Sequence, residues 1–132
     1  MLLVDSSVWI EYFNGRNTLS TDYLDAALAT QPVLMGDLIL AEILQGFRED
    51  AQFEQALAML GRLPQANMLS SALAVQSAQN YRRLRRLGVT VRKTIDCLIA
   101  TFAMSSGCEF LHDDRDFDPF EEYLGLLVVN PA

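Results

Sequence analysis

Four acidic side chains carry the chemistry that this sequence suggests. They are spread over the chain and read Asp5, Glu42, Asp96 and Asp114. Carboxylates that converge repel one another, and this repulsion raises their pKa values unless a cation neutralises them. Ligand sets made only of oxygen select hard cations. The residue types therefore predict an acidic site for Mg²⁺, for which Mn²⁺ can substitute.

Such a site suits the hydrolysis of phosphodiester bonds. A divalent cation lowers the pKa of water, orients it for in-line attack and stabilises the leaving oxygen. The single histidine, His112, excludes a nuclease that uses two histidines as acid and base. The sequence has no G-x-S-x-G, GxxxxGK[ST] or GxGxxG motif, so we expect neither a serine triad nor a nucleotide cofactor. No Cys/His spacing indicates zinc.

Neighbours of these acids are further candidates. Ser7, two residues after the first acid, is placed either to orient a carboxylate or a metal, or to cap the helix that follows. Asp116 is an additional acid near Asp114, and Asp113 leaves open which of these side chains faces the metal. A single acid in a turn or at a helix N-terminus also has an ordinary structural explanation. Glu42 is the exception, because an acid among Leu, Ile and Ala is costly to bury unpaired.

Alternating strands and helices would bring the acids together. Short apolar runs predict strands at Leu2–Asp5, Pro32–Met35, Glu109–His112 and Leu126–Val129. The expected helices are Ser7–Phe13, a helix capped by Ser20 or Thr21 and ending at Thr30, Gly36–Phe47, Asp50–Arg62, a helix from Ser70 or Ser71 to Leu87, Ile95–Ser106 capped by Thr94, and a turn at Pro119–Tyr123. This alternation predicts an α/β fold, with a central parallel sheet flanked by helices on both faces. Ligands of such sheets bind beyond the carboxyl ends of the strands.

Length and composition predict one domain over residues 1–132. About half of the residues are hydrophobic (51%), which is enough for a real core. No apolar run approaches the roughly 18–20 residues needed to cross a bilayer, and Met1–Val4 lacks the features of a signal peptide. Cys97 and Cys108 fit a reducing compartment as free thiols. We therefore expect a cytoplasmic protein that does not associate with membranes.

The distribution of charge is more informative than its sum. A net charge of −7 argues against nucleic-acid binding, because affinity for phosphate backbones comes from Lys and Arg. However, six of the ten basic residues fall in one stretch without acids: Arg82, Arg83, Arg85, Arg86, Arg92 and Lys93. Arginine grips phosphate with a two-pronged fork of donors. This stretch is either a surface that binds a nucleic-acid backbone or ordinary exposed charge, which for its first four members would be the solvated face of a helix.

Four segments of the chain carry a family resemblance. They are LLVDSSVWIEYF, LAEILQGF, TIDCLIATFA and FLHDDRDFD, and they extend from Leu2 to Asn130 in the family's order and spacing. With these motifs the sequence resembles the PIN-domain nucleases, and more closely the VapC toxins of bacterial and archaeal toxin–antitoxin pairs. One such motif would be weak support, whereas four in register are specific.

The resemblance implies a role for each of the candidate residues. The family's motif positions fall on Asp5 with the hydroxyl of Ser7, Glu42, Asp96, and Asp114 with Asp116 as a nearby additional acid. In the family these acids bind Mg²⁺ or Mn²⁺ and support endonucleolytic cleavage of RNA. Members usually form homodimers, and a VapB-type antitoxin neutralises them with a tail that lies across the active site. The resemblance thus implies a PIN-like three-layer fold, an RNA substrate and an antitoxin partner.

The acidic residues allow three interpretations other than a nuclease. A non-catalytic PIN-fold module that binds nucleic acid or acts as a scaffold would lack one or more of the four acids, yet all are present. A metal-dependent adhesion site would need a serine where the chain has Trp9. A phosphatase of the D-x-D-x-T type would need an acid at Ser7. The non-catalytic module is the alternative that stays open.

Overall fold

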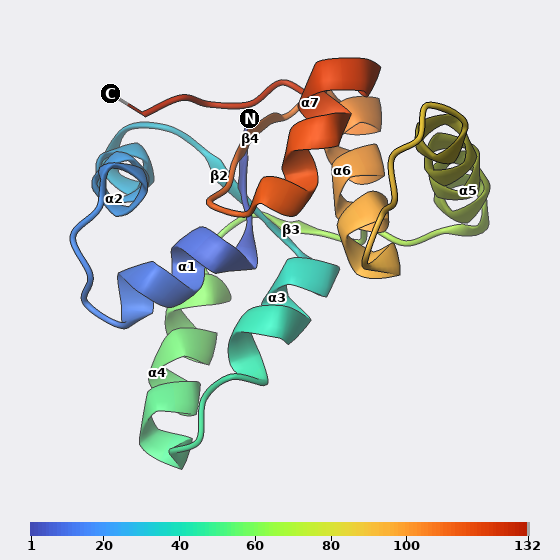
Figure 1. The fold of residues 1–132 in the computed structure, drawn as a ribbon. Coiled ribbons are helices and arrows are strands. Elements are labelled where there is room, and N and C mark those ends of the chain that lie inside the picture. Colours follow the sequence, from blue (N-terminus) through green and yellow to red (C-terminus); the bar gives the residue numbers. More distant parts are fainter. Residues whose placement is uncertain (132) are drawn as a thin grey trace.

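The computed structural model describes residues 1–131 as an α/β fold built around a parallel sheet (Figure 1). Its strands are β1 (Leu2–Val4), β2 (Val33–Gly36), β3 (Gln65–Ala66) and β4 (Glu109–Leu111). Its helices are α1 (Ser6–Phe13), α2 (Leu19–Thr30), α3 (Asp37–Leu44), α4 (Asp50–Leu60), α5 (Ser71–Arg86), α6 (Thr94–Ser106), the 3₁₀ helix η1 (Arg115–Phe117) and α7 (Asp118–Leu124).

The sheet has the strand order β3-β2-β1-β4, and all of its pairs are parallel. Leu2 on β1 pairs with Val33 on one side and Glu109 on the other. All three residues of β1 are buried, as expected for the central strand of a sheet covered on both faces. Because the strands are parallel, the residues that follow β1, β2 and β4 lie at the same edge. This edge is where the sequence predicts the acidic site.

Helices cover both faces of the sheet, which confirms the predicted fold class. Figure 1 shows α1 and α2 on one side of the strands and α5 and α6 on the other. The core between the layers includes Trp9 and three fully buried phenylalanines, Phe110, Phe117 and Phe120. Over residues 1–131, no helix combines the length and the apolar content needed to span a bilayer.

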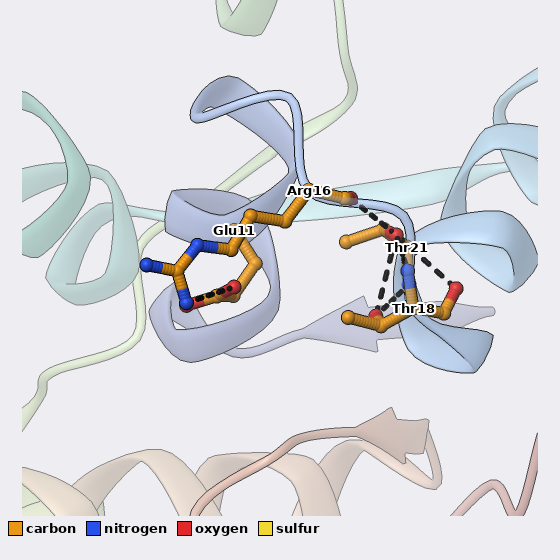
Figure 2. Close-up of polar contacts among 4 residues, drawn as sticks. All are labelled: Glu11, Arg16, Thr18 and Thr21. Carbon is orange, nitrogen blue, oxygen red and sulfur yellow. Dashed lines mark hydrogen bonds and ion pairs between the residues drawn. The ribbon is translucent and has the colours of Figure 1, made fainter.

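The start of α2 differs from the expectation. The capping residue is Thr18, and neither Ser20 nor Thr21 caps this helix. The Thr18 hydroxyl accepts from the Thr21 N–H at 3.0 Å, and the Thr21 hydroxyl accepts from the Thr18 N–H at 2.8 Å (Figure 2). Thr21 thus fills the position that Glu or Gln usually takes in a capping box. Its hydroxyl also donates to the Arg16 carbonyl, and Arg16 forms an ion pair with Glu11 (Figure 2).

Other element boundaries also shift. Thr94 is the first residue of α6 and does not cap it, because the N-cap position falls on Lys93. The expected strand at 126–129 is reduced to one isolated bridge between Val128 and Phe110. The two-residue strand β3 was not predicted, because Gln65 and Ala66 are too few to produce an alternating pattern.

Gly36 provides a test of the packing that leads from β2 into α3. A Cβ at this position would overlap the sulfur of buried Met68 and lie 2.9 Å from its Cγ. We expect Gly36→Ala to lower the free energy of unfolding by about 1–3 kcal/mol, as overpacking does in cores. Urea denaturation measures the loss. Gly46→Ala is the matched control, because the nearest atom to its Cβ is the Ile43 carbonyl oxygen at 3.4 Å. Equal losses in both variants would contradict this account of the packing.

Candidate active site

Asp5 lies directly beyond the carboxyl end of β1. Its backbone N–H donates to the Leu111 carbonyl at 2.9 Å, which extends the pairing of β1 with β4 by one residue. Its side chain caps α1, because Oδ2 accepts from the Ser7 N–H at 3.1 Å. The residue is only 3% exposed. Burial raises the pKa of Asp5, hydrogen bonds from Ser7 and Ser6 oppose the rise, and the charge of Asp114 adds to it.

Glu42 reaches the same edge from α3. Its Oε1 accepts a hydrogen bond of 3.2 Å from the hydroxyl of Ser6, in the first turn of α1. Partial burial and the charge of Asp5 raise the pKa of Glu42, whereas Ser6 and Lys93 lower it. The acid that was hardest to explain from the sequence therefore has a polar partner and belongs to a group of neighbouring charges.

Asp96 is the most perturbed acid of the site. It lies in the first turn of α6 and is 4% exposed. Burial, followed by repulsion from Asp114, raises its pKa from 3.8 to about 6. Its Oδ2 is buried and has no hydrogen-bond partner within residues 1–131. A buried carboxylate oxygen without a donor is costly, so it requires a proton, water or a cation.

The loop after β4 carries the acids among which the sequence could not decide, and it holds Asp113 and Asp114 by different contacts. Asp114 caps η1 and accepts from the Asp116 N–H at 2.9 Å. Asp113 is held elsewhere, because its Oδ1 accepts from the Ser20 hydroxyl at 2.7 Å. The Ser7 hydroxyl accepts from the Asp113 N–H at 3.1 Å, so it fastens this loop to α1. The cap of α1 is Asp5, and the predicted alternative of Ser7 as the cap is wrong.

Three carboxylates meet closely enough to share a cation. Asp96, Asp114 and Asp116 each offer an oxygen within 4.8 Å of the others. Asp5 and Glu42 lie outside this group, yet their charges act on Asp96 and raise its pKa. The donor set consists of oxygens alone, and one of its members, Asp96, has a buried oxygen that lacks a partner among the described residues. Both observations fit a hard divalent cation.

Part of the predicted basic surface adjoins these acids. Arg92 and Lys93 line a pocket of about 410 Å³ with Asp114 and Asp116. Lys93 lies close enough to lower the pKa values of Glu42 and Asp96. The pocket also contains Arg115, Asp113 and Ser7. Sequence reasoning did not single out Arg115, which is located between two acids of the same motif.

The other four basic residues lie elsewhere. Hydrogen bonds join Asn80 to Thr101 and Cys97 to the Ser77 carbonyl, so α5 and α6 run in the same direction. The end of α5 is therefore level with the end of α6, whereas Asp96 lies at the start of α6. This remote end of α5 carries Arg82, Arg83, Arg85 and Arg86, all exposed. The predicted basic stretch is thus two separate surfaces.

Comparisons with known proteins identify the family. A family model described as the PIN domain matches residues 2–122. The chain belongs to the PIN-domain family. It is 33% identical over 132 residues to ribonuclease VapC11 of Mycobacterium tuberculosis, covering 98% of each protein. These two findings confirm the family resemblance inferred from the four motifs.

Solved structures share the fold of this PIN domain. A complex described as VapBC2 of Rickettsia felis, bound to a DNA fragment from its promoter, aligns with a TM-score of 0.78 and 16% identity, over 98% of this chain and 97% of that one. A toxin–antitoxin complex from Klebsiella pneumoniae aligns with a TM-score of 0.73 and 20% identity, over 100% and 98% of the two chains. At these identities the similarity concerns the fold.

The pKa of Asp96 leads to a prediction about stability. A folded-state pKa above the ordinary value means that the folded protein binds this proton more tightly than the unfolded chain does. Ionised Asp96 therefore lowers the free energy of unfolding. This loss is absent below about pH 4 and complete above the folded-state pKa of about 6. In EDTA, we expect Asp96→Asn to be about 1–3 kcal/mol more stable than the wild type at pH 7.5. The difference should vanish as the pH falls toward 4.

Urea denaturation across this pH range measures the effect. Glu54→Gln is the control, because it removes an exposed acid on α4 that is not part of the acidic site. Asp96→Asn with no gain in stability at pH 7.5 would contradict the interpretation that the buried charge of Asp96, repelled by its neighbours, destabilises the folded protein when no cation is bound.

Proposed function

We propose that this PIN domain is a metal-dependent endoribonuclease, the toxin of a VapBC-type pair. The observation that carries the proposal is the group formed by Asp96, Asp114 and Asp116, with Asp5 and Glu42 beside it. Full-length identity of 33% to a VapC ribonuclease supports the same activity. We propose that residues 1–132 form one domain, which the family match over residues 2–122 supports.

Mg²⁺ is the cation that we propose for the site, with Mn²⁺ as a substitute. Asp5, Asp96 and Asp114 would hold it, with Asp116 as an additional acid and Glu42 near a water or a second ion. When bound, the cation supplies acidification of a water for in-line attack and stabilisation of the charge on the leaving oxygen. The oxygens that Asp96, Asp114 and Asp116 offer within 4.8 Å of one another support a hard cation at this edge, as does the unpartnered Oδ2 of Asp96. Asp5 lies outside this group, and its assignment rests on the family resemblance.

The chain's own residues prepare this chemistry. The Ser6 hydroxyl donates to Glu42 and fixes the direction of that carboxylate. The Ser7 N–H fixes Asp5 in the same way. Lys93 offsets part of the negative charge and, with Arg92, would hold the RNA backbone at the pocket. The arginines at the end of α5 would contact RNA only at a distance from the acids.

The partners follow from the same proposal. We propose an RNA substrate, a homodimer and neutralisation by a VapB-type antitoxin, which the fold shared with a toxin–antitoxin complex supports. We also propose a cytoplasmic location, and the buried free thiols of Cys97 and Cys108 support a reducing compartment. The alternative is a non-catalytic module of the same fold that binds nucleic acid.

Cleavage of total cellular RNA by the purified protein tests the activity. We expect discrete fragments with Mg²⁺ or Mn²⁺ and none with EDTA. Asp5→Asn and Asp96→Asn should each lower the rate by about 100-fold or more, because each removes a charge that the cation requires. Asparagine is as good an N-cap as aspartate, so Asp5→Asn should preserve α1.

Glu54→Gln is again the matched control and should cleave at the wild-type rate. Circular dichroism establishes that each variant is folded. If folded, antitoxin-free protein cuts no RNA under any of these metal conditions, the nuclease proposal is wrong and the non-catalytic module replaces it. Cleavage that persists in EDTA, or in folded Asp96→Asn, would refute the metal mechanism alone.

A further inference from the structure

The pocket lined by Asp114 and Asp116, called the acidic pocket below, also contains a positively charged side chain, that of Arg115. Arg115 lies between Asp114 and Asp116 in the chain and lines the pocket with Arg92 and Lys93. Its side chain is exposed, and over residues 1–131 it forms no ion pair within 4.0 Å. Both of its neighbours in the chain, Asp114 and Asp116, belong to the group with Asp96, so the guanidinium remains available for a ligand.

The backbone around Arg115 is well anchored. Asp114 closes the turn by accepting from the Asp116 N–H, and its own N–H donates to Nδ1 of His112 at 3.1 Å. Phe117, two residues after Arg115, is fully buried and packs against Phe110 of β4. The base of the Arg115 side chain is therefore fixed relative to the three acids. When the backbone that carries a long side chain is already fixed, less conformational entropy is lost as that side chain binds a ligand.

An RNA strand needs positive charge at this position. The net charge of −7 and the clustered carboxylates repel phosphate, and one divalent cation offsets only part of that charge. Asp96 lies at the start of α6, whereas the arginines at the end of α5 lie level with the other end of α6. Arg92, Lys93 and Arg115 are the basic residues that line the acidic pocket. They come from two different segments, one before α6 and one in η1.

We propose that Arg115 binds a phosphate of the RNA strand at the acidic centre. The planar guanidinium presents two parallel donors that match two phosphate oxygens, which a lysine cannot reproduce. The inference rests on the proposed nuclease function, since it names a residue that holds the substrate of that activity. It adds a third cation to the pair, Arg92 and Lys93, that the sequence indicated.

Binding of RNA in the absence of cleavage tests the contact. The probe is a fluorescein-labelled, mixed-sequence RNA of 12 nucleotides, and the background is Asp5→Asn with Mg²⁺. Fluorescence anisotropy between 50 and 200 mM salt should show about 10-fold weaker binding when Arg115→Ala is added. The slope of log K against log salt should fall by about 0.7, the value for one phosphate contact on a single strand. Arg115→Lys should keep the slope and lose less affinity.

Arg62→Ala is the matched control. Arg62 is exposed and precedes β3, so the direction of the parallel sheet places it at the edge opposite the acids. The control should alter neither the affinity nor the slope. In the cleavage assay on total RNA, Arg115→Ala in the otherwise unchanged chain should require about 10-fold more RNA for half-maximal rate.

The outcomes separate this inference from the proposed function. If the wild type cleaves RNA while Arg115→Ala binds and cleaves like the Arg62→Ala control, the role of Arg115 is refuted and the nuclease stands. If the wild type cleaves nothing but Arg115→Ala still weakens RNA binding, the phosphate contact stands and the nuclease is refuted. If Arg115 only balanced the acids, its removal would strengthen Mg²⁺ binding and leave RNA affinity unchanged, which would also refute the contact.

Discussion

The burial of carboxylates that also repel one another, at one edge of the sheet, is the constraint on which the structure depends. Asp5 and Asp96 are 3% and 4% exposed, and burial raises the pKa of each. A fold that served stability alone would not collect acids where water cannot screen them. The chain keeps them together by placing one after β1, one in the first turn of α6 and others in the loop after β4. Ser6, Ser7 and Lys93 offset part of this cost, and a cation or protons would offset more of it.

Hydrogen bonds between distant segments hold this arrangement in place. The Asp5 N–H binds the Leu111 carbonyl, and the Ser7 hydroxyl accepts from the Asp113 N–H. These contacts join the start of α1 to the loop that carries the other acids. The Ser20 hydroxyl turns Asp113 away from the cluster. The loop is therefore set before any ligand binds, and a preorganised site loses less free energy on binding.

Much of this architecture could be predicted from the sequence, because local patterns encode it. The apolar run that ends in an acid predicts the position of β1 and of the edge that carries the site, and the four motifs indicate the family. Contacts between distant residues were not accessible in this way. No pattern shows that Ser6 binds Glu42, since that contact joins residues 36 positions apart. Nor does a continuous basic stretch reveal that the helix α5 carries four of its six residues away from the acids.

A calorimetric titration of the purified wild type with Mn²⁺ at pH 7.5 tests most directly whether the acidic edge is a cation site. The account predicts saturable binding that is lost or greatly weakened in Asp96→Asn. This substitution removes the carboxylate whose buried oxygen has no partner within the described residues. Binding that is absent from folded wild type, or unchanged in folded Asp96→Asn, would contradict it.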